Sequence, residues 1–246
     1  MKIVKPSVEL LHYTPNPECV IERCGRVCYQ SQHRVQVCEA CKGTRIRDYK
    51  DDFTGLDQSC NACNGTGTDI ASALVFIKRI RENGHESVLE HASAGFSIIT
   101  DRGVTHEIVR HRIASFSQES TRFCNYGKEQ FGREIAVIEP PGLREPGYTG
   151  SPEMADGDLG AWASLVEGCE HIYLEMLDRG VSPQIARSVL PNSLKSEICM
   201  TANFREWRHF LRLRTSPKAH PQMREVAEMI RAELMRISPV CFEDIQ

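Results

Sequence analysis

The stretch from residue 110 to residue 122 reads RHRIASFSQESTR, which places three arginines and one histidine close together. Guanidinium groups at this spacing repel one another unless anions neutralise them, and the planar fork of arginine suits phosphate and carboxylate groups. The alternative is a solvated helical face whose cations pair with Glu107 and Glu119. Charge alone leaves both interpretations open.

The sequence on either side predicts long helices and few strands. Apolar residues recur at three- and four-residue spacing over 159–179, 204–211 and 223–234, and a similar pattern over 71–82 ends at Asn83-Gly84. Alternation over 94–100 favours a strand that a turn at Asp101-Arg102-Gly103 ends. Residues 1–31 predict a short strand followed by a helix, and Ser182-Pro183 opens a shorter helix that Pro191 closes.

This order of elements predicts an α+β fold. Strands and helices do not alternate regularly, as a doubly wound sheet requires. The sequence Gly65-Thr66-Gly67 is its one G-x-G, and it lacks the third glycine of a dinucleotide-binding turn. A bound dinucleotide is therefore not expected to lie in a Rossmann turn.

The spacing R-H-R-x7-S, which ends at Ser120, resembles the signature of the flavin-dependent thymidylate synthases. Three further stretches resemble elements of the same family: His85-Glu86-Ser87 with Glu90-His91, the segment from Pro183 to Pro191, and Asn203-x-Arg205 followed by Leu211-x-Leu213-Arg214 and His220. The resemblance covers most of residues 85–222. It implies a single catalytic domain over residues 1–246, with long helices packed on a small mixed sheet.

The resemblance also implies a reaction, the reductive methylation of dUMP to dTMP. In the family, 5,10-methylenetetrahydrofolate supplies the methylene, reduced FAD supplies the hydride and NADPH regenerates the reduced flavin. These ligands are anionic, which gives a reason for concentrating arginines in a chain of net charge -3. Family members are homotetramers, so the resemblance implies a homotetramer here.

Site residues follow from the same resemblance. FAD is expected to contact Ser87, Arg110, His111, Arg112, Asn203, Arg205 and His209. The nucleotide dUMP is expected to contact Glu107, Arg110, Gln118, Ser120, Arg122, Arg187 and Arg214. Gln118 stands where the family frequently has Glu, and His209 where it commonly has Asn.

Two of these residues are candidates for catalysis, Arg214 and Ser120. A guanidinium beside the uracil ring stabilises negative charge as C5 becomes nucleophilic, so we expect Arg214 to be the activating residue. For Ser120 we favour hydrogen bonding over covalent catalysis, because the sequence establishes no adjacent base. The alternatives are structural: Ser87 with Glu90 as a helix-capping box, and Arg187 as an exposed cation near a helix end.

Residues 34–69 interrupt the helical pattern and predict an inserted zinc-knuckle subdomain. The pairs Cys38-x2-Cys41 and Cys60-x2-Cys63 have the spacing of a four-thiolate zinc site, and four thiolates leave no open position for catalysis. The glycines after the second pair resemble those of DnaJ-type knuckles and let backbone amides turn toward the sulfurs. The alternatives are a redox-active dithiol pair or plain thiols.

Composition limits the classes of function. The sequence has 41% hydrophobic residues and no apolar run of membrane-spanning length, so we expect a cytoplasmic, soluble enzyme without a membrane partner. Net charge -3, and an excess of acids over cations in residues 34–69, argue against nucleic-acid binding. Residues 203–224 hold six cations and one acid, which predicts a local site for small anions. The alternative function is a nucleic-acid- or protein-binding protein that carries its zinc knuckle on an inactive flavoenzyme core.

Overall fold

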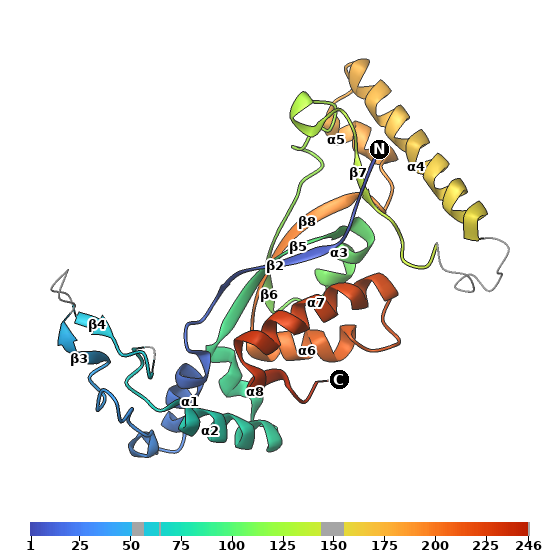
Figure 1. Ribbon diagram of the computed structural model, residues 1–246. Coiled ribbons are helices and arrows are strands. Elements are labelled where there is room, and N and C mark those ends of the chain that lie inside the picture. Colours follow the sequence, from blue (N-terminus) through green and yellow to red (C-terminus); the bar gives the residue numbers. More distant parts are fainter. Residues whose placement is uncertain (51–56, 64, 144–154, 246) are drawn as a thin grey trace. The chain divides into compact units, whose positions relative to one another are not determined.

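The computed structural model describes residues 1–50, 57–63, 65–143 and 155–245, and Figure 1 shows the order of its elements. The described strands are β1 (Lys2–Val4), β2 (Ser7–Tyr13), β3 (Ile46–Lys50), β4 (Asp57–Ser59), β5 (Ser93–Asp101), β6 (Ala114–Gln118), β7 (Ala136–Ile138) and β8 (Lys195–Asn203). The described α-helices are α1 (Pro17–Val27), α2 (Ile70–Glu82), α3 (Arg102–Ile108), α4 (Ala155–Asp178), α5 (Pro183–Ala186), α6 (Phe204–Arg214), α7 (Pro221–Ile237) and α8 (Pro239–Phe242). Four short 3-10 helices complete the description: η1 (Gln32–Arg34), η2 (Glu86–His91), η3 (Glu129–Phe131) and η4 (Arg187–Val189).

The described residues form three small sheets beside these helices. The largest has four strands in the order β2-β5-β8-β6. Strands β1 and β7 pair in parallel, with Lys2 opposite Ala136, and β3 pairs with β4 in antiparallel fashion. Long helices with small sheets and no doubly wound order confirm the predicted α+β, non-Rossmann class.

The chain divides into two compact units. Unit 1 comprises Met1–Glu9, Phe96–Met200 and Leu213–Ile230, and unit 2 comprises Leu10–Gly95, Thr201–Arg212 and Arg231–Gln246. The strands β2, β5 and β8 each contribute residues to both units. The expectation of a single catalytic domain with a subdomain at 34–69 stays a prediction, and within that range residues 51–56 and 64 lie outside the described residues.

The core of unit 1 forms where α4 meets β7. Val166 and Tyr173 of α4 are buried with Val137 and Leu194. The Tyr173 hydroxyl accepts a hydrogen bond from the Tyr126 backbone N–H at 3.3 Å, so this polar group is satisfied inside the core. The predicted helix over 159–179 is therefore the one whose apolar face completes this unit.

The core of unit 2 joins α6 to β5 and α8. The Trp207 indole N–H donates to the Ala94 carbonyl at 3.0 Å, and the rings of Phe204 and Phe242 lie 5.1 Å apart. Helices α1 and α2 approach closely at Gly25, where an added Cβ would lie 2.7 Å from the Phe76 ring. A side chain at this position would push the two helices apart.

Two local expectations need correction. The strand β5 does end at Asp101, but a helix begins at Arg102 in place of a turn: Asp101 Oδ1 accepts the Val104 N–H at 2.7 Å and caps α3. This helix has only seven residues, which is too short for a clear apolar period. Ser87 does not cap a helix either, because it lies inside η2, whose N-cap position is His85.

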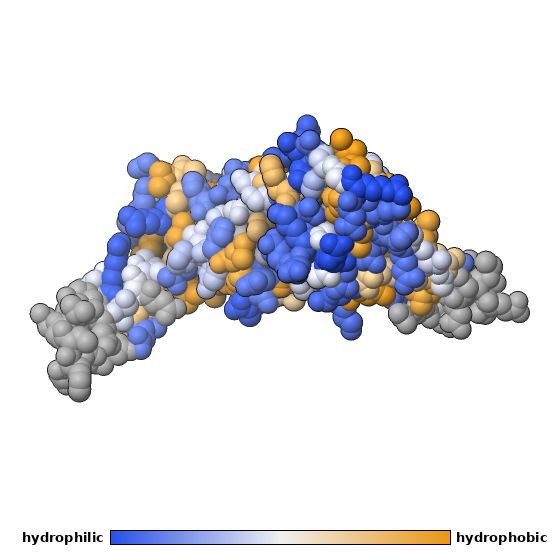
Figure 2. Space-filling view, turned by 90° about the horizontal axis from the view of Figure 1, so that it is seen from above, coloured by the Kyte–Doolittle hydropathy of each residue, from blue (hydrophilic) through white to orange (hydrophobic). Residues whose placement is uncertain are grey.

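No helix in the described ranges combines the length and the apolar character that crossing a membrane requires. Figure 2 shows apolar residues interspersed with hydrophilic ones on one face of the molecule.

Candidate active site

The guanidinium of Arg214, the last residue of α6, is held by two residues near the end of α3. Its Nη1 donates to Glu107 Oε2 at 2.9 Å and its Nη2 to the Glu107 carbonyl oxygen at 3.2 Å. Its Nε donates to His111 Nε2 at 3.0 Å. These contacts fix the plane of the guanidinium before any ligand arrives.

The contact with Arg214 determines the protonation of His111. A nitrogen that accepts a hydrogen bond carries a lone pair, so Nε2 is unprotonated and the neutral ring holds its proton on Nδ1. The His111 residue is buried, with 4% of its surface exposed. Because the imidazole is neutral, Glu107 is the group in this cluster that balances the charge of Arg214.

A tight turn after α3 separates the members of the Arg110–Arg112 segment. The Arg110 N–H donates to the Glu107 carbonyl and the His111 N–H to the Ile108 carbonyl, so the chain leaves the helix within one turn. His111 then faces the interior, whereas Arg110 and Arg112 are exposed. Among the described residues neither arginine pairs with a carboxylate, which leaves both guanidinium groups available to anionic ligands.

The surface-pair alternative for this segment is wrong in its choice of partners. Glu107 pairs with Arg214 at 2.9 Å. Glu119 accepts from Lys195 Nζ and from the Tyr126 hydroxyl, both at 2.8 Å. The two acids near the arginines in sequence therefore neutralise groups elsewhere in unit 1.

A cavity of about 430 Å³ lies beside the Glu107 carboxylate in unit 1. Its walls include the apolar residues Val104 and Trp162 and the polar residues Asp101 and His220. A mostly apolar cavity with a few polar groups is the usual form of a small-molecule site.

A second group of predicted dUMP contacts meets at the turn after β6. The Arg187 Nη1 donates to Thr121 Oγ1 at 3.2 Å, which brings this arginine beside residues 120–122. Ser120 Oγ accepts the Arg122 N–H at 3.3 Å. In the described part of the chain Ser120 contacts no general base. This arrangement favours a hydrogen-bonding role for Ser120 over covalent catalysis.

Gln118 lies at the end of β6, and its side chain braces two neighbouring elements. Its Nε2 donates to Thr105 Oγ1 of α3 at 2.9 Å and to Ser196 Oγ of β8 at 3.0 Å. A glutamate could not make these two donations, because an ionised carboxylate only accepts. The departure from the family pattern at this position therefore serves a structural contact in this chain.

The predicted FAD contacts fall in both units. Arg110, His111 and Arg112 belong to unit 1, and Ser87, Asn203, Arg205 and His209 belong to unit 2. In unit 2, Ser87 and Arg205 line one cavity of about 350 Å³ together with Tyr29 and Phe76. Asn203 Oδ1 accepts the Glu206 N–H at 2.8 Å at the start of α6, so Asn203 also has a capping role.

Sequence reasoning missed the paired state of the arginines on α6. Arg208 is fully buried and pairs with Glu86 at 2.9 Å and with Asp244 at 2.7 Å. Arg212 pairs with Glu86 at 2.6 Å, and Arg205 pairs with Glu90 at 2.5 Å. The predicted anion site over 203–224 is therefore much smaller than its composition indicates, because acids outside this segment pair with four of its cations, Arg214 included.

These ion pairs shift the pKa values of the acids. Burial alone would raise the pKa of Glu86, but hydrogen bonds from Arg212 and the charge of Arg208 hold it below its ordinary value. Burial likewise opposes ionisation of Asp244, and Arg208 and Arg81 lower its pKa nonetheless. Both carboxylates are thus ionised partners of a buried arginine.

The four cysteines of the two CxxC pairs come together as predicted. All four are buried, and their sulfurs lie within 4.8 Å of one another. Cys41 Sγ and Cys63 Sγ are 3.7 Å apart, and the Gly67 N–H donates to Cys63 Sγ at 3.3 Å. Burial opposes ionisation of Cys63, but this N–H and the neighbouring thiols lower its pKa to about 6.

The fold has a counterpart among solved structures. The chain is similar to the crystal structure of a UMP/dUMP methylase, PolB from Streptomyces cacaoi, bound with 5-Br dUMP, with a TM-score of 0.69 and 24% identity over 99% of this chain and 96% of that one. This similarity defines the class of fold.

Sequence comparisons define the family. Residues 9–240 match the family model Thy1, described as thymidylate synthase complementing protein. The chain is 30% identical over 240 residues to a flavin-dependent thymidylate synthase from Geobacter sulfurreducens, covering 97% of this chain and 86% of the relative. It is 37% identical over 177 residues to one from Corynebacterium efficiens, covering 72% and 71%. The chain therefore belongs to the family of flavin-dependent thymidylate synthases.

Proposed function

We propose that this chain converts dUMP to dTMP with 5,10-methylenetetrahydrofolate, FAD and NADPH. The observation that carries this proposal is the Arg214 guanidinium, which Glu107 and His111 of the neighbouring segment hold in one orientation. A fixed cation stabilises developing charge without reorganising during the reaction, which is the most effective form of electrostatic catalysis. In this role Arg214 stabilises negative charge on the uracil ring as C5 attacks.

Glu107 and His111 are positioning residues for Arg214. The Glu107 carboxylate and carbonyl both accept from the guanidinium, and the neutral His111 ring adds a third contact without adding charge. A protonated His111 would lose this contact and would repel Arg214. The cluster therefore works with His111 neutral.

The turn at residues 120–122 supplies groups for the phosphate of dUMP. Arg187 lies against Thr121, and Arg122 is exposed on the same turn. Two guanidinium forks close together suit a phosphate dianion, and the Ser120 hydroxyl can donate a further hydrogen bond. We assign these three residues to dUMP binding.

The residues present also fit FAD. The cavity that Ser87 and Arg205 line in unit 2 adds the aromatic rings of Tyr29 and Phe76 to polar donors, a combination that suits a ring system carrying phosphates. When bound and reduced, FAD supplies the hydride that completes the methyl group. In unit 1, Arg110 and Arg112 are exposed and pair with no carboxylate among the described residues, and we assign both to FAD on the family resemblance.

The cysteine cluster fits one zinc ion per chain. Zinc–sulfur bonds of about 2.3 Å place the sulfurs of a tetrahedral site about 3.8 Å apart. The sulfurs of Cys41 and Cys63 are 3.7 Å apart, and those of Cys38 and Cys60 are 4.0 Å apart. Both distances also far exceed a disulfide bond, so the geometry favours a metal over an oxidised pair.

Exposed apolar side chains support assembly into a homotetramer. In unit 1, Phe123 is 80% exposed, Ile113 71% and Leu165 69%. A protein–protein contact that covered these side chains would remove their apolar surface from water. Light scattering is expected to give about four times the chain mass of 27.8 kDa, and a monomer mass would contradict the assembly.

The first test of this function is the colour of the purified protein. We expect a yellow protein whose absorbance spectrum is that of a bound flavin, because the donors assigned to FAD occur in both units. A colourless protein that also fails to bind added FAD would contradict the proposal. It would favour the alternative in which an inactive core carries a binding module at residues 34–69.

A further inference from the structure

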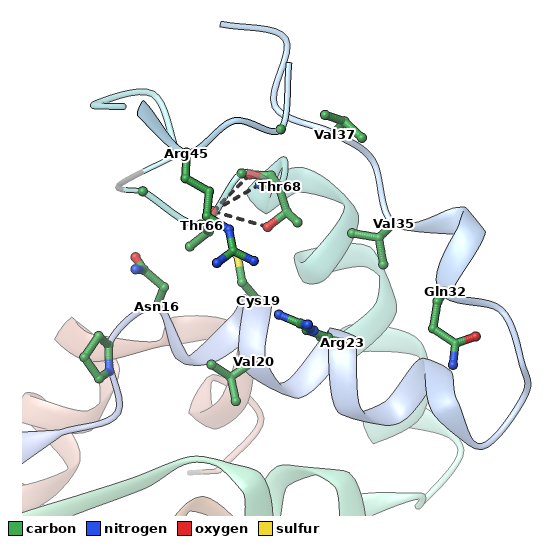
Figure 3. Close-up of a pocket in the computed structure, with 14 residues that line it drawn as sticks. Asn16, Cys19, Val20, Arg23, Gln32, Val35, Val37, Arg45, Thr66 and Thr68 are labelled. Carbon is green, nitrogen blue, oxygen red and sulfur yellow. Dashed lines mark hydrogen bonds between the residues drawn. The ribbon is translucent and has the colours of Figure 1, made fainter. Parts of the chain in front are cut away.

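A cavity of about 570 Å³ lies in unit 2 between α1 and the cysteine insert, residues 34–69. This volume is in the range of small-molecule sites. Figure 3 draws the residues that line it, with Cys19, Val20 and Arg23 from α1 on one side and Arg45 and Thr66 from the insert on the other. None of the residues assigned to dUMP, FAD or zinc lines this cavity.

The cysteine cluster builds one wall of the cavity. The Arg45 carbonyl accepts the Cys60 N–H at 3.0 Å, and Thr66 Oγ1 donates to the Cys63 carbonyl at 2.8 Å. Gly67 has φ +77°, and an added Cβ there would lie 2.9 Å from the Gly43 carbonyl oxygen. The wall therefore has a fixed shape that depends on the folded knuckle.

The charges that line the cavity are all positive. Arg23 and Arg45 are its charged residues, and Figure 3 shows their guanidinium groups extending into the space between α1 and the insert. Among the described residues neither pairs with a carboxylate. Arg45 also has φ +70°, a backbone region that favours glycine and that recurs at ligand sites. Two cations facing one cavity repel each other until an anion lies between them.

The remaining lining narrows the chemistry of that anion. Val20, Val35 and Val37 give the cavity apolar surface, and the hydroxyls of Thr66 and Thr68 contact each other at its edge. Paired guanidinium forks recognise phosphate, and apolar walls favour an organic group attached to it. We propose that this cavity binds a small organic phosphate of nucleotide size.

Calorimetry on the FAD- and zinc-loaded protein, with dUMP saturating the catalytic site, tests this proposal. AMP is the probe, and inorganic pyrophosphate tests the contribution of the organic part. We expect AMP to bind, and Arg23→Ala and Arg45→Ala each to weaken binding about tenfold or more. The matched control is Arg34→Ala, an exposed arginine of the same insert that does not line the cavity, which should change AMP affinity less than about twofold.

A footprint at Cys19 gives a second measurement that needs no variant. Cys19 lines the cavity, whereas Cys24, which is buried to a similar degree, lines neither this cavity nor the one assigned to FAD. AMP should therefore slow alkylation of Cys19 by iodoacetamide and leave that of Cys24 unchanged, as read by peptide mass spectrometry. Absence of both heat and protection would overturn the proposal. So would equal AMP affinity in the Arg23→Ala/Arg45→Ala variant, pyrophosphate binding as tight as AMP, or tighter binding of a single-stranded oligonucleotide through the same arginines.

Discussion

Arg214 shows how one side chain acquires a chemical role from its neighbours. Its guanidinium would be an ordinary exposed cation on α6 without Glu107 and His111, which together contact all three of its nitrogens. The family resemblance predicts each of these residues separately, with Glu107 as a dUMP contact and His111 as an FAD contact. That Arg214 joins the other two in one cluster could not be predicted, because it lies 107 residues from Glu107 and 103 from His111 along the chain.

Replacement of Arg214 should separate catalysis from flavin binding. Arg214→Ala is expected to keep its flavin absorbance and to be reduced by NADPH, yet to form dTMP at least about 100-fold more slowly, because one preorganised charge-stabilising group is lost. Arg214→Lys should recover only part of the rate, because an ammonium ion lacks the planar fork that contacts Glu107 and His111. Flavin oxidation with and without dUMP, measured beside dTMP, separates the steps.

The control for this experiment is Arg236→Ala, which removes an exposed arginine paired with Glu233 near the end of α7. It should leave dTMP formation unchanged. Near-normal dTMP formation by Arg214→Ala would show that the activating residue lies elsewhere.

At the scale of elements, α6 is tied to η2 and to the residues after α8 by a buried ion-pair network. Arg208 is fully buried between Glu86 and Asp244. The apolar spacing of residues 204–211 predicts this helix correctly. The sequence could not predict its ion pairs, because Glu86 and Asp244 are distant from Arg208 along the chain.

This network predicts a pH dependence of stability. The pKa values of Glu86 and Asp244 are lowered from 4.5 and 3.8. As the pH falls, the unfolded chain therefore binds protons at these carboxyls before the folded protein does. The stability that the ion pairs contribute is fully present above about pH 4.5, and it is lost as the pH falls through the pKa values of the two carboxyls in the folded protein. Glu86→Gln/Asp244→Asn should lower the free energy of unfolding by roughly 3 kcal/mol at pH 7, because it leaves Arg208 buried without a counter-charge.

Urea unfolding at pH 7 and at roughly pH 3 measures the difference between the variant and the parent protein. The difference should narrow at the lower pH, because the unfolded parent chain then binds protons at these two carboxyls and its folded state loses stability accordingly. Glu175→Gln, which removes half of an exposed pair with Arg179, should change stability by less than about 0.5 kcal/mol at either pH. A difference independent of pH would refute the assignment of the ion pairs.

The cysteine insert is the second element with its own prediction. We expect one zinc ion per chain by elemental analysis of protein prepared without chelators, because this segment holds four buried thiols with little other apolar surface. Cys60→Ser/Cys63→Ser should lose the metal, whereas Cys24→Ser/Cys28→Ser, which changes two cysteines outside the cluster, should retain it. The prediction would be wrong if the parent protein contained almost no metal, or if Cys60→Ser/Cys63→Ser retained its zinc.

For the whole molecule, the sequence predicted class and family better than it predicted contacts. Helical spacing located α2, α4, α6 and α7, and the CxxC spacing located the buried cysteine cluster, because both patterns are local. The seven-residue helix α3 was missed for lack of a long period, and the pairing of the α6 arginines was missed because it joins distant segments. The motifs identify the family because their order along the chain is a property of the sequence itself. A count of charges in one segment misleads when the acids that pair with its arginines lie in distant segments.

The central claim is the reaction, and the most direct test is formation of dTMP by the purified, FAD-loaded protein. We expect dTMP from dUMP only when 5,10-methylenetetrahydrofolate and NADPH are both present, with one NADPH consumed per dTMP formed. UMP, a substrate named for the structurally similar PolB, serves as the comparison nucleotide and should be methylated far more slowly. A flavin-loaded protein that forms no dTMP, or one that forms it equally well without flavin, would contradict the account.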